Sequence, residues 1–288
     1  MLYPARYFFI LEVVMNTKTQ DSLRALVECS IMIALSTVLS VVPLFEMPYG
    51  GSITLASFLP VVVIAYRHGL AYGLGTAATT AVIQMLLGLK NFSYFTTWQS
   101  LVALAVFDYV LAFVVFGLAG IFRRVFKQQN LGMVAGAAMA CVLRYICHVI
   151  SGATIWAGLS IPTEAALIYS LSYNATYMVP ETIILVLTAG YLSSALDFRT
   201  KNPTRIKSET LDTVSSWCIG GAGLLMLCAL ITDTVLVFSQ LQNYNSGEFM
   251  ILGLTAVNWL AVGIVTGVAI VIAAALIIYA KARNTVKS

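Results

Sequence analysis

Four charged or titratable side chains stand inside stretches of sequence that are otherwise apolar enough to cross a membrane. They are Asp108 in VFDYVLAF, Arg144 and His148 in LRYICHVISGATIW, and Glu181 directly after Pro180. A charge at the centre of a bilayer costs about 2.5 to 3.5 kcal/mol on insertion scales, so such residues usually face a cavity or a charged partner. Arg144 and His148 are four residues apart and therefore share one helix face. The pattern predicts a polar cavity inside a helix bundle.

Aromatic and amide side chains accompany these charges near one end of the predicted spans. Trp156 ends the second stretch quoted above, and Tyr169, Tyr173 and Tyr177 form one helical stripe beside Asn174. Indole and phenol rings attract flat cations, by about 0.5 to 2 kcal/mol for a good contact. A buried carboxylate prefers a positive or hydrogen-bond-donating neighbour. The predicted ligand is small, aromatic and positively charged, with polar edges.

Each of these features also has a purely structural interpretation. Trp98 and Trp156 stand at span ends, where tryptophan often marks the membrane interface. The tyrosine stripe is compatible with ordinary helix packing. Asp108 and Arg144 could pair with each other, and Glu181 could only adjust a helix that is kinked at the preceding proline. The ligand interpretation depends on these side chains converging in space.

The elements that must position these residues are apolar runs of about 20 residues, the length of a helix that crosses about 30 Å of hydrocarbon. Of the 288 residues, 60% are hydrophobic and 10% charged, against roughly a quarter charged in soluble domains. The predicted fold class is an all-α polytopic membrane protein: a six-helix core with an appended two-helix hairpin. About eight spans, the second a short one, are expected near 23–42, 53–66, 69–88, 98–120, 131–152, 165–195, 214–239 and 250–280.

Lysine and arginine residues follow a pattern that indicates topology. They cluster before the first span, between the second and third, after the fourth, after the sixth and at the C-terminal end. The loops on the opposite side hold only Lys90. Because cytoplasmic loops collect positive charge, a multi-pass cell-membrane protein with both termini in the cytoplasm is predicted. The net charge of +4 reflects this topology, so no nucleic-acid partner is predicted.

A polar segment, DFRTKNPTRIKSETLD, interrupts the apolar pattern and is typical of a linker. The spans after it contain Asp233 as their only charged residue. The five cysteines lie in apolar spans without C-x-x-C spacing, so neither a disulfide, a metal site nor a cofactor is predicted. The predicted organisation is a cytoplasmic N-terminal segment (1–22), a six-span substrate-binding core (23–197), a cytoplasmic linker (198–212) and a transmembrane hairpin with a basic tail (213–288).

Four stretches resemble one known family when they are taken together, in order and spacing. They are MPYGGSITLASFLPVVVIAYRHGLAYGLGTA, FDYVLAFVVFGLAGIFRR, LRYICHVISGATIWAG and YSLSYNATYMVPE. This set resembles the thiamine-specific S component of energy-coupling factor (ECF) transporters, the ThiT family, over about residues 22–197. The resemblance implies a high-affinity thiamine-binding subunit of an ATP-driven importer, with an outward-facing pocket. Its implied partners are thiamine, a transmembrane coupling subunit and two ATPase subunits.

The resemblance also implies which residues bind the ligand. His148 and Trp156 match an H-x7-W element of the family, with the indole as the stacking face for the cationic thiazolium ring. Gly51 stands where other members carry tryptophan, so the loop would close over the ligand through its backbone. The implied ligand-binding residues are Asp108, Tyr109, His148, Trp156, Tyr169, Asn174, Trp98 and Gly51.

The first span carries a small-xxx-small pattern, Ser30 to Ala34, that is implied to contact the coupling subunit by close helix packing. Two features depart from the family pattern. Two further spans follow residue 213, and Glu181 has no family counterpart. Replacement of Glu181 by glutamine is therefore expected to change thiamine binding little, in contrast to Asp108→Asn and Trp156→Ala.

Two other functions are compatible with the same residues. A self-sufficient secondary transporter for an organic cation could use Asp108 or Glu181 as a proton-coupled carboxylate, although the chain shows no inverted repeat. An intramembrane enzyme could use Asp108 and His148 as acid and base. The chain has no metal-binding H-E-x-x-H motif or nucleophile motif, so the sequence favours a protein that is not an enzyme.

Overall fold

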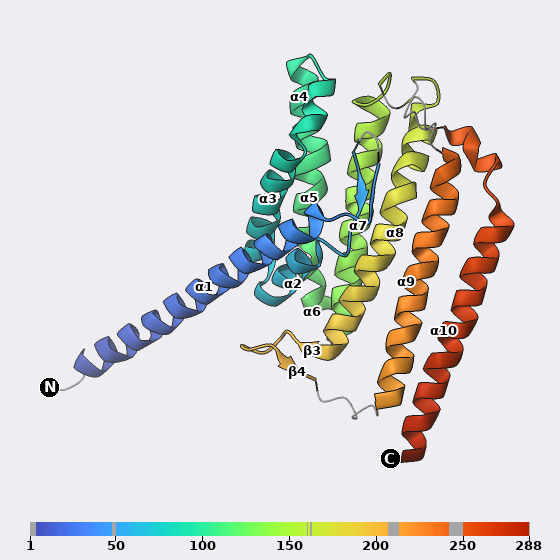
Figure 1. Cartoon of the computed structure of the whole chain (residues 1–288). Coiled ribbons are helices and arrows are strands. Elements are labelled where there is room, and N and C mark those ends of the chain that lie inside the picture. Colours follow the sequence, from blue (N-terminus) through green and yellow to red (C-terminus); the bar gives the residue numbers. More distant parts are fainter. Residues whose placement is uncertain are drawn as a thin grey trace.

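The computed structural model describes residues 4–47, 50–159, 161, 163–206, 213–241 and 250–287, and it is mainly helical (Figure 1). In this part of the chain, seven helical segments are long and apolar enough to cross a membrane. The predicted class, an all-α polytopic membrane protein, is confirmed. These segments are α1 (Pro4–Val41), α3 (Leu70–Leu87), the irregular run from α4 to α6 (Trp98–Val125), α7 (Gln129–Thr154), α8 (Ala166–Ala195), α9 (Thr213–Leu241) and α10 (Trp259–Lys287).

The second expected span, near 53–66, is only half a crossing. A short antiparallel hairpin of β1 (Phe45–Glu46) and β2 (Ser52–Ile53) precedes it, and α2 covers only Leu59–His68. Ten residues of helix extend about 15 Å, half the thickness of the hydrocarbon. Eight of these ten residues are buried inside the bundle, so the helix is apolar up to Arg67 and His68 at its end without facing lipid.

The fourth span is irregular where the sequence places its charged residue, Asp108. Between α4 (Trp98–Leu104) and α5 (Ala112–Val114), the π-helical segment η2 (Ala105–Leu111) contains Asp108. A π-helical turn widens the backbone and is often found at functional sites. The run ends with the 3₁₀ segment η3 (Val115–Ile121) and α6 (Phe122–Val125).

A glycine in η3 lets the fourth span pack against α2 without space for a side chain. A Cβ atom on Gly120 would lie 2.0 Å from the carbonyl oxygen of Ala65, which no side chain can tolerate. The close backbone approach therefore holds η3 directly against α2.

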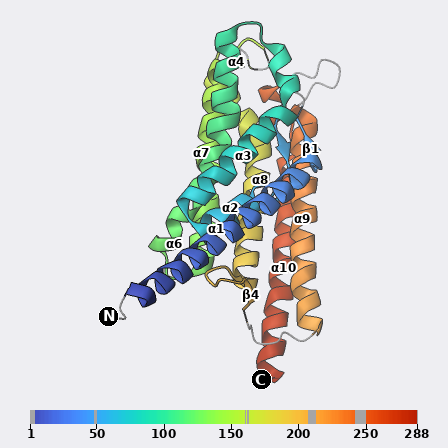
Figure 2. The same cartoon turned by 90° about the vertical axis from the view of Figure 1, so that its left-hand side faces the viewer.

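The helices α7 and α8 pack along one another, and α9 lies beside α8 with α10 on its outer side (Figures 1 and 2). The predicted linker begins as a second small hairpin, β3 (Leu196–Asp197) with β4 (Thr204–Arg205). Residues 207–212 of that linker lie outside the described residues. The predicted boundary at residue 22 falls inside α1, which continues from Pro4 to Val41. The division into four segments stays a prediction.

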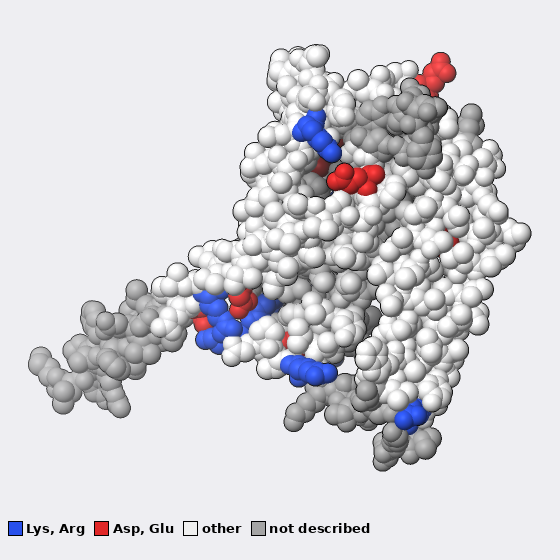
Figure 3. Space-filling view, in the orientation of Figure 1, with Lys and Arg blue, Asp and Glu red and all other residues white. Residues whose placement is uncertain are grey.

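Charged side chains gather at one end of the bundle (Figure 3). There the Glu28 carboxylate on α1 accepts hydrogen bonds from Arg24, at 3.0 Å, and from Arg67, at 2.6 Å. Arg67 also donates to the carbonyl oxygens of Thr200 and Lys201, at 3.1 and 2.6 Å. This cluster connects α1, the end of α2 and the β3–β4 connection, and it leaves a nearly uncharged belt above it on the face shown in Figure 3.

Candidate functional site

A cavity of about 340 Å³ lies in the half of the bundle away from the basic end. Its lining residues on α7 come from the second half of that helix, and Met47, Gly50 and Gly51 between β1 and β2 also line it. A volume of this size suits a small organic ligand. The polar residues that line it include Ser40, Glu46, Ser52, Thr54, Gln84, Lys90, Asn91, Asp108, Tyr109, Arg144, His148, Tyr173, Asn174, Tyr177 and Glu181.

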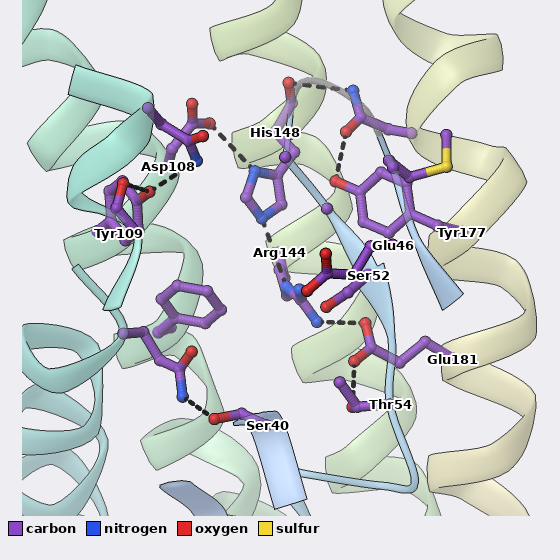
Figure 4. Close-up of a pocket in the computed structure, with 18 of the residues that line it drawn as sticks. Ser40, Glu46, Ser52, Thr54, Asp108, Tyr109, Arg144, His148, Tyr177 and Glu181 are labelled. Atoms are coloured by element: carbon purple, nitrogen blue, oxygen red, sulfur yellow. Dashed lines mark hydrogen bonds and ion pairs between the residues drawn. The ribbon is translucent and has the colours of Figure 1, made fainter. Parts of the chain in front are cut away.

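The Asp108 carboxylate joins three separate parts of the chain at this cavity. The indole Nε1 of Trp156 donates to Asp108 Oδ2 at 2.8 Å, and His148 Nδ1 lies 3.1 Å from Oδ1 (Figure 4 shows the histidine contact). The side chains of Asp108 and His148 are 12% and 13% exposed, so they are largely shielded but still open to the cavity. The predicted convergence of Asp108, His148 and Trp156 is therefore observed.

Arg144 extends this network one helical turn deeper. Its Nε donates to His148 Nε2 at 3.4 Å, and its Nη1 donates to Glu181 Oε2 at 2.6 Å (Figure 4). Since His148 Nε2 accepts, the ring proton lies on Nδ1 and is donated to Asp108. The chain of contacts runs from Glu181 through Arg144 and His148 to Asp108 and explains how an arginine is accommodated here.

The partner of Arg144 corrects two structural interpretations of the sequence. Its ion pair is with Glu181 on α8, not with Asp108. Glu181 does more than adjust a kinked helix, because its second oxygen, Oε1, accepts a hydrogen bond from Thr54 at 2.7 Å. No motif marks this pair in the sequence, because its members are 37 residues apart on different helices.

Asn174 is held in place by its own helix and by α7. Its Nδ2 donates to the carbonyl oxygens of Ser170 at 2.9 Å and of His148 at 3.2 Å. Its Oδ1 accepts from the Tyr177 hydroxyl at 2.8 Å. A Cβ atom on Gly152 would lie 2.2 Å from Ser170 Oγ, so the glycine allows α7 and α8 to approach closely. Asn174 and Tyr177 are thereby presented to the cavity in one fixed orientation.

The β1–β2 connection approaches α8 through its glycines. Gly50 and Gly51 have φ values of +97° and +93°, a backbone region that favours glycine. A Cβ atom on Gly51 would lie 2.8 Å from the Tyr177 ring, and the Tyr173 hydroxyl donates to the Gly50 carbonyl at 2.9 Å. The loop backbone thus lies against the α8 tyrosines, and its closure over a ligand stays a prediction.

Tyr109 also lines the cavity, and its position depends on the segment before α4. Its hydroxyl donates to the carbonyl oxygen of Gly88 at 3.1 Å and accepts from Asn91 Nδ2 at 3.0 Å. Asn91 belongs to the 3₁₀ segment η1 (Leu89–Tyr94). Tyr109, which the family resemblance implies as a ligand-binding residue, is thus fixed at the wall of the cavity, and its contact with a ligand stays a prediction.

Two of the predicted site residues are not brought into the cavity. Trp98 is 69% exposed and Tyr169 packs at the margin of the hydrophobic core, one turn from Tyr173. The rings that contact Trp156 are instead Tyr94 and Phe95, with centroid distances of 5.9 and 5.0 Å. Tyr94 and Phe95 stand four and three positions before Trp98. The sequence therefore shows an aromatic cluster here, but it does not show which of these rings faces Trp156.

The first two thirds of the chain are similar to known proteins. The family model described as thiamine transporter protein (Thia_YuaJ) matches residues 26–199. The thiamine transporter ThiT of Bacillus subtilis strain 168 is 34% identical over 173 residues, covering 56% of this chain and 86% of that protein. A solved structure of ThiT from Listeria monocytogenes is 23% identical with a TM-score of 0.46, covering 59% of this chain and 91% of that one. The resemblance read from the sequence is confirmed, and the chain belongs to the thiamine transporter protein family.

Proposed function

We propose that this membrane protein binds thiamine with high affinity in the cavity around Asp108 and passes it inward as the substrate-binding subunit of an ECF importer. Membership of the family supports a thiamine-specific transport role. The observation that carries the proposal is the Asp108 carboxylate, which is held by His148 and Trp156 at the wall of a cavity of about 340 Å³.

The proposed binding mode follows from charge and shape. Thiamine carries a permanent positive charge on a flat aromatic ring, and a shielded carboxylate offsets that charge more strongly than an exposed one would. The hydrogen bond to Asp108 orients the Trp156 indole, on which the cationic ring would stack. Asn174 and Tyr177 supply further hydrogen-bonding atoms. Because the network is already assembled, binding loses little ordering entropy.

The direction of capture is inferred from the charges at the two ends of the bundle. The cavity lies away from the basic cluster around Arg67, and basic ends of membrane proteins face the cytoplasm. The proposed pocket therefore opens to the outside, and both chain ends lie inside.

The proposed coupling surface lies on α1. Ser30 and Ala34 are exposed there, next to exposed Ile31 and Leu35. Small residues four apart let a partner helix approach closely in a membrane. The 288 residues contain no G-x-x-x-x-G-K-[ST] phosphate loop, so ATP-driven uptake would use ATPase subunits on other chains, joined through a transmembrane coupling subunit.

Tryptophan fluorescence offers a direct test of thiamine binding. Trp156 is buried beside the cavity, whereas Trp98, Trp217 and Trp259 are 69%, 77% and 54% exposed. Titration of the purified protein with thiamine is expected to change the fluorescence saturably below micromolar concentration, while riboflavin and biotin leave it unchanged. Trp156→Phe should remove most of the change without removing binding of radiolabelled thiamine. Absence of saturable binding in both assays contradicts the proposal.

Uptake measurements test the coupling part separately. Vesicles that contain this chain alone are expected to take up no thiamine against a gradient, whereas vesicles that also contain ECF coupling and ATPase subunits should do so with ATP. Uptake by the chain alone, driven by a proton gradient, would instead identify a secondary transporter. Thiamine binding would then stand while the ECF assignment fails.

A further inference from the structure

The deep end of the cavity carries a buried ion pair that the binding mode above does not use. Arg144 and Glu181 are 7% and 5% exposed and are joined at 2.6 Å between Nη1 and Oε2 (Figure 4). The arginine carbon Cζ lies 5.2 Å from the centroid of the Phe58 ring and 5.1 Å from that of Phe113. Two aromatic faces and one carboxylate thus surround the guanidinium group.

Arg144 nevertheless remains open to the cavity, which it lines together with Glu181. Its Nε is used by His148 and its Nη1 by Glu181, and its Nη2 has no hydrogen-bond partner among the residues that the structure describes. Guanidinium groups bind phosphate oxygens through paired N–H donors. At the deep end of the cavity, the Arg144 guanidinium could therefore bind a phosphate group, but its positive charge is offset by the Glu181 carboxylate.

Both members of the Arg144–Glu181 pair contribute to the net charge of the cavity lining. The described lining contains the carboxylates of Glu46, Asp108 and Glu181, and the cations of Lys90 and Arg144, for a formal net charge of −1. His148 is counted as neutral in this formal charge. Loss of the Glu181 charge would make the lining neutral and leave Arg144 without its counter-ion.

We propose that Glu181 determines specificity: by pairing with Arg144 it makes the site bind thiamine in preference to the phosphate esters of thiamine. This inference rests on the proposed function. A phosphate ester adds about −1.5 to −2 charges near pH 7. With Glu181 present, that phosphate meets an arginine already engaged by a carboxylate, and the two anions repel. Without the Glu181 charge, Arg144 is released to bind the phosphate.

The experiment compares two ligands on matched variants. The quantity measured is the Kd for thiamine monophosphate divided by the Kd for thiamine, by titration of purified protein. Glu181→Gln is expected to lower this ratio by about tenfold, because it changes the charge available to the phosphate. Arg144→Gln is expected to raise it, since Glu181 is then left uncompensated. Arg144→Gln/Glu181→Gln, which removes both charges, should return the ratio close to the wild-type value.

Asp233→Asn is the matched control, because it also turns a carboxylate into an amide but lies on α9, away from the cavity-lining residues. Its ratio should equal that of the wild type. If the wild type binds no thiamine, the proposed function itself fails. If it binds thiamine but the ratio stays unchanged in both Glu181→Gln and Arg144→Gln, the specificity role of Glu181 is overturned while the proposed function stands. If one of these two variants does not fold, the ratio measured for the other variant tests the role of Glu181.

Discussion

The cavity region and the α9–α10 hairpin each contain a carboxylate inside an apolar helical segment, Asp108 and Asp233. The two carboxylates differ in the hydrogen bonds that they accept. Asp108 accepts hydrogen bonds from Trp156 and from His148, so that both oxygens have a partner. In the hairpin, Asp233 Oδ2 accepts from Thr266, while its Oδ1 is buried with no partner among the described residues. Only the first carboxylate belongs to a network.

The difference follows from how many neighbours each helix has. In the apolar stretches of α7 and α8, 39% and 33% of the residues are buried inside the protein. In those of α9 and α10, the buried shares are 17% and 11%. A helix surrounded on several sides can receive donors from several elements, but a helix in a two-helix hairpin has one protein neighbour along most of its length. Inside the apolar segments, the network around Asp108 and the cavity therefore lie among the surrounded helices.

The largest effect is expected for Asp108→Asn. The amide keeps the shape of the side chain but removes the charge that balances the thiamine cation, so the Kd for thiamine should rise by about a hundredfold, equivalent to about 2.7 kcal/mol. Isothermal titration of purified protein measures this change. An unchanged Kd would show that the charged ring of the ligand lies elsewhere.

Trp156→Ala should be the next most damaging change. It removes both the proposed stacking surface and the hydrogen bond that the indole donates to Asp108 at 2.8 Å. The expected increase in the Kd for thiamine is about tenfold or more, from loss of a cation–π contact and of a charge-assisted hydrogen bond. Trp98→Ala is the control, and equal losses in both variants would contradict the placement of the site.

Gly51→Ala is expected to have an intermediate effect through the backbone. The residue has φ +93°, and the added methyl group would lie 2.8 Å from the Tyr177 ring. Forcing an alanine into this backbone region costs about 1 to 2 kcal/mol, and the loop or the tyrosine must also shift. Thiamine affinity should fall several-fold, whereas Gly263→Ala on α10, where space is open, should leave it unchanged.

The smallest effect is expected in the hairpin. Thr266→Val removes the hydroxyl that donates to Asp233, so thermal stability in detergent should change while the Kd for thiamine changes by less than about twofold. A large change in thiamine affinity would mean that the hairpin and the cavity are energetically coupled.

Part of the site could be predicted before the fold was known. Asp108, His148, Trp156 and Asn174 are polar or amphipathic residues in apolar spans, and their spacing on each helix predicted a common cavity. Such residues are costly to bury in a membrane, so their presence carries information by itself. Tyr169 and Trp98 show the limit of this reasoning. A helical stripe does not reveal how far along the helix the cavity extends, and Tyr169 lies one turn beyond it.

The sequence by itself determined that this chain crosses a membrane several times and carries a small set of polar side chains toward one cavity, because hydrophobic length and charge follow directly from composition. Tertiary structure alone decided that Arg144 pairs with Glu181, that residues 53–66 form only half a span, and that Tyr94 and Phe95 face Trp156. These outcomes depend on the relative rotation and depth of neighbouring elements. Rotation and depth are set by close contacts such as Gly120 on Ala65, which involve atoms far apart in the chain.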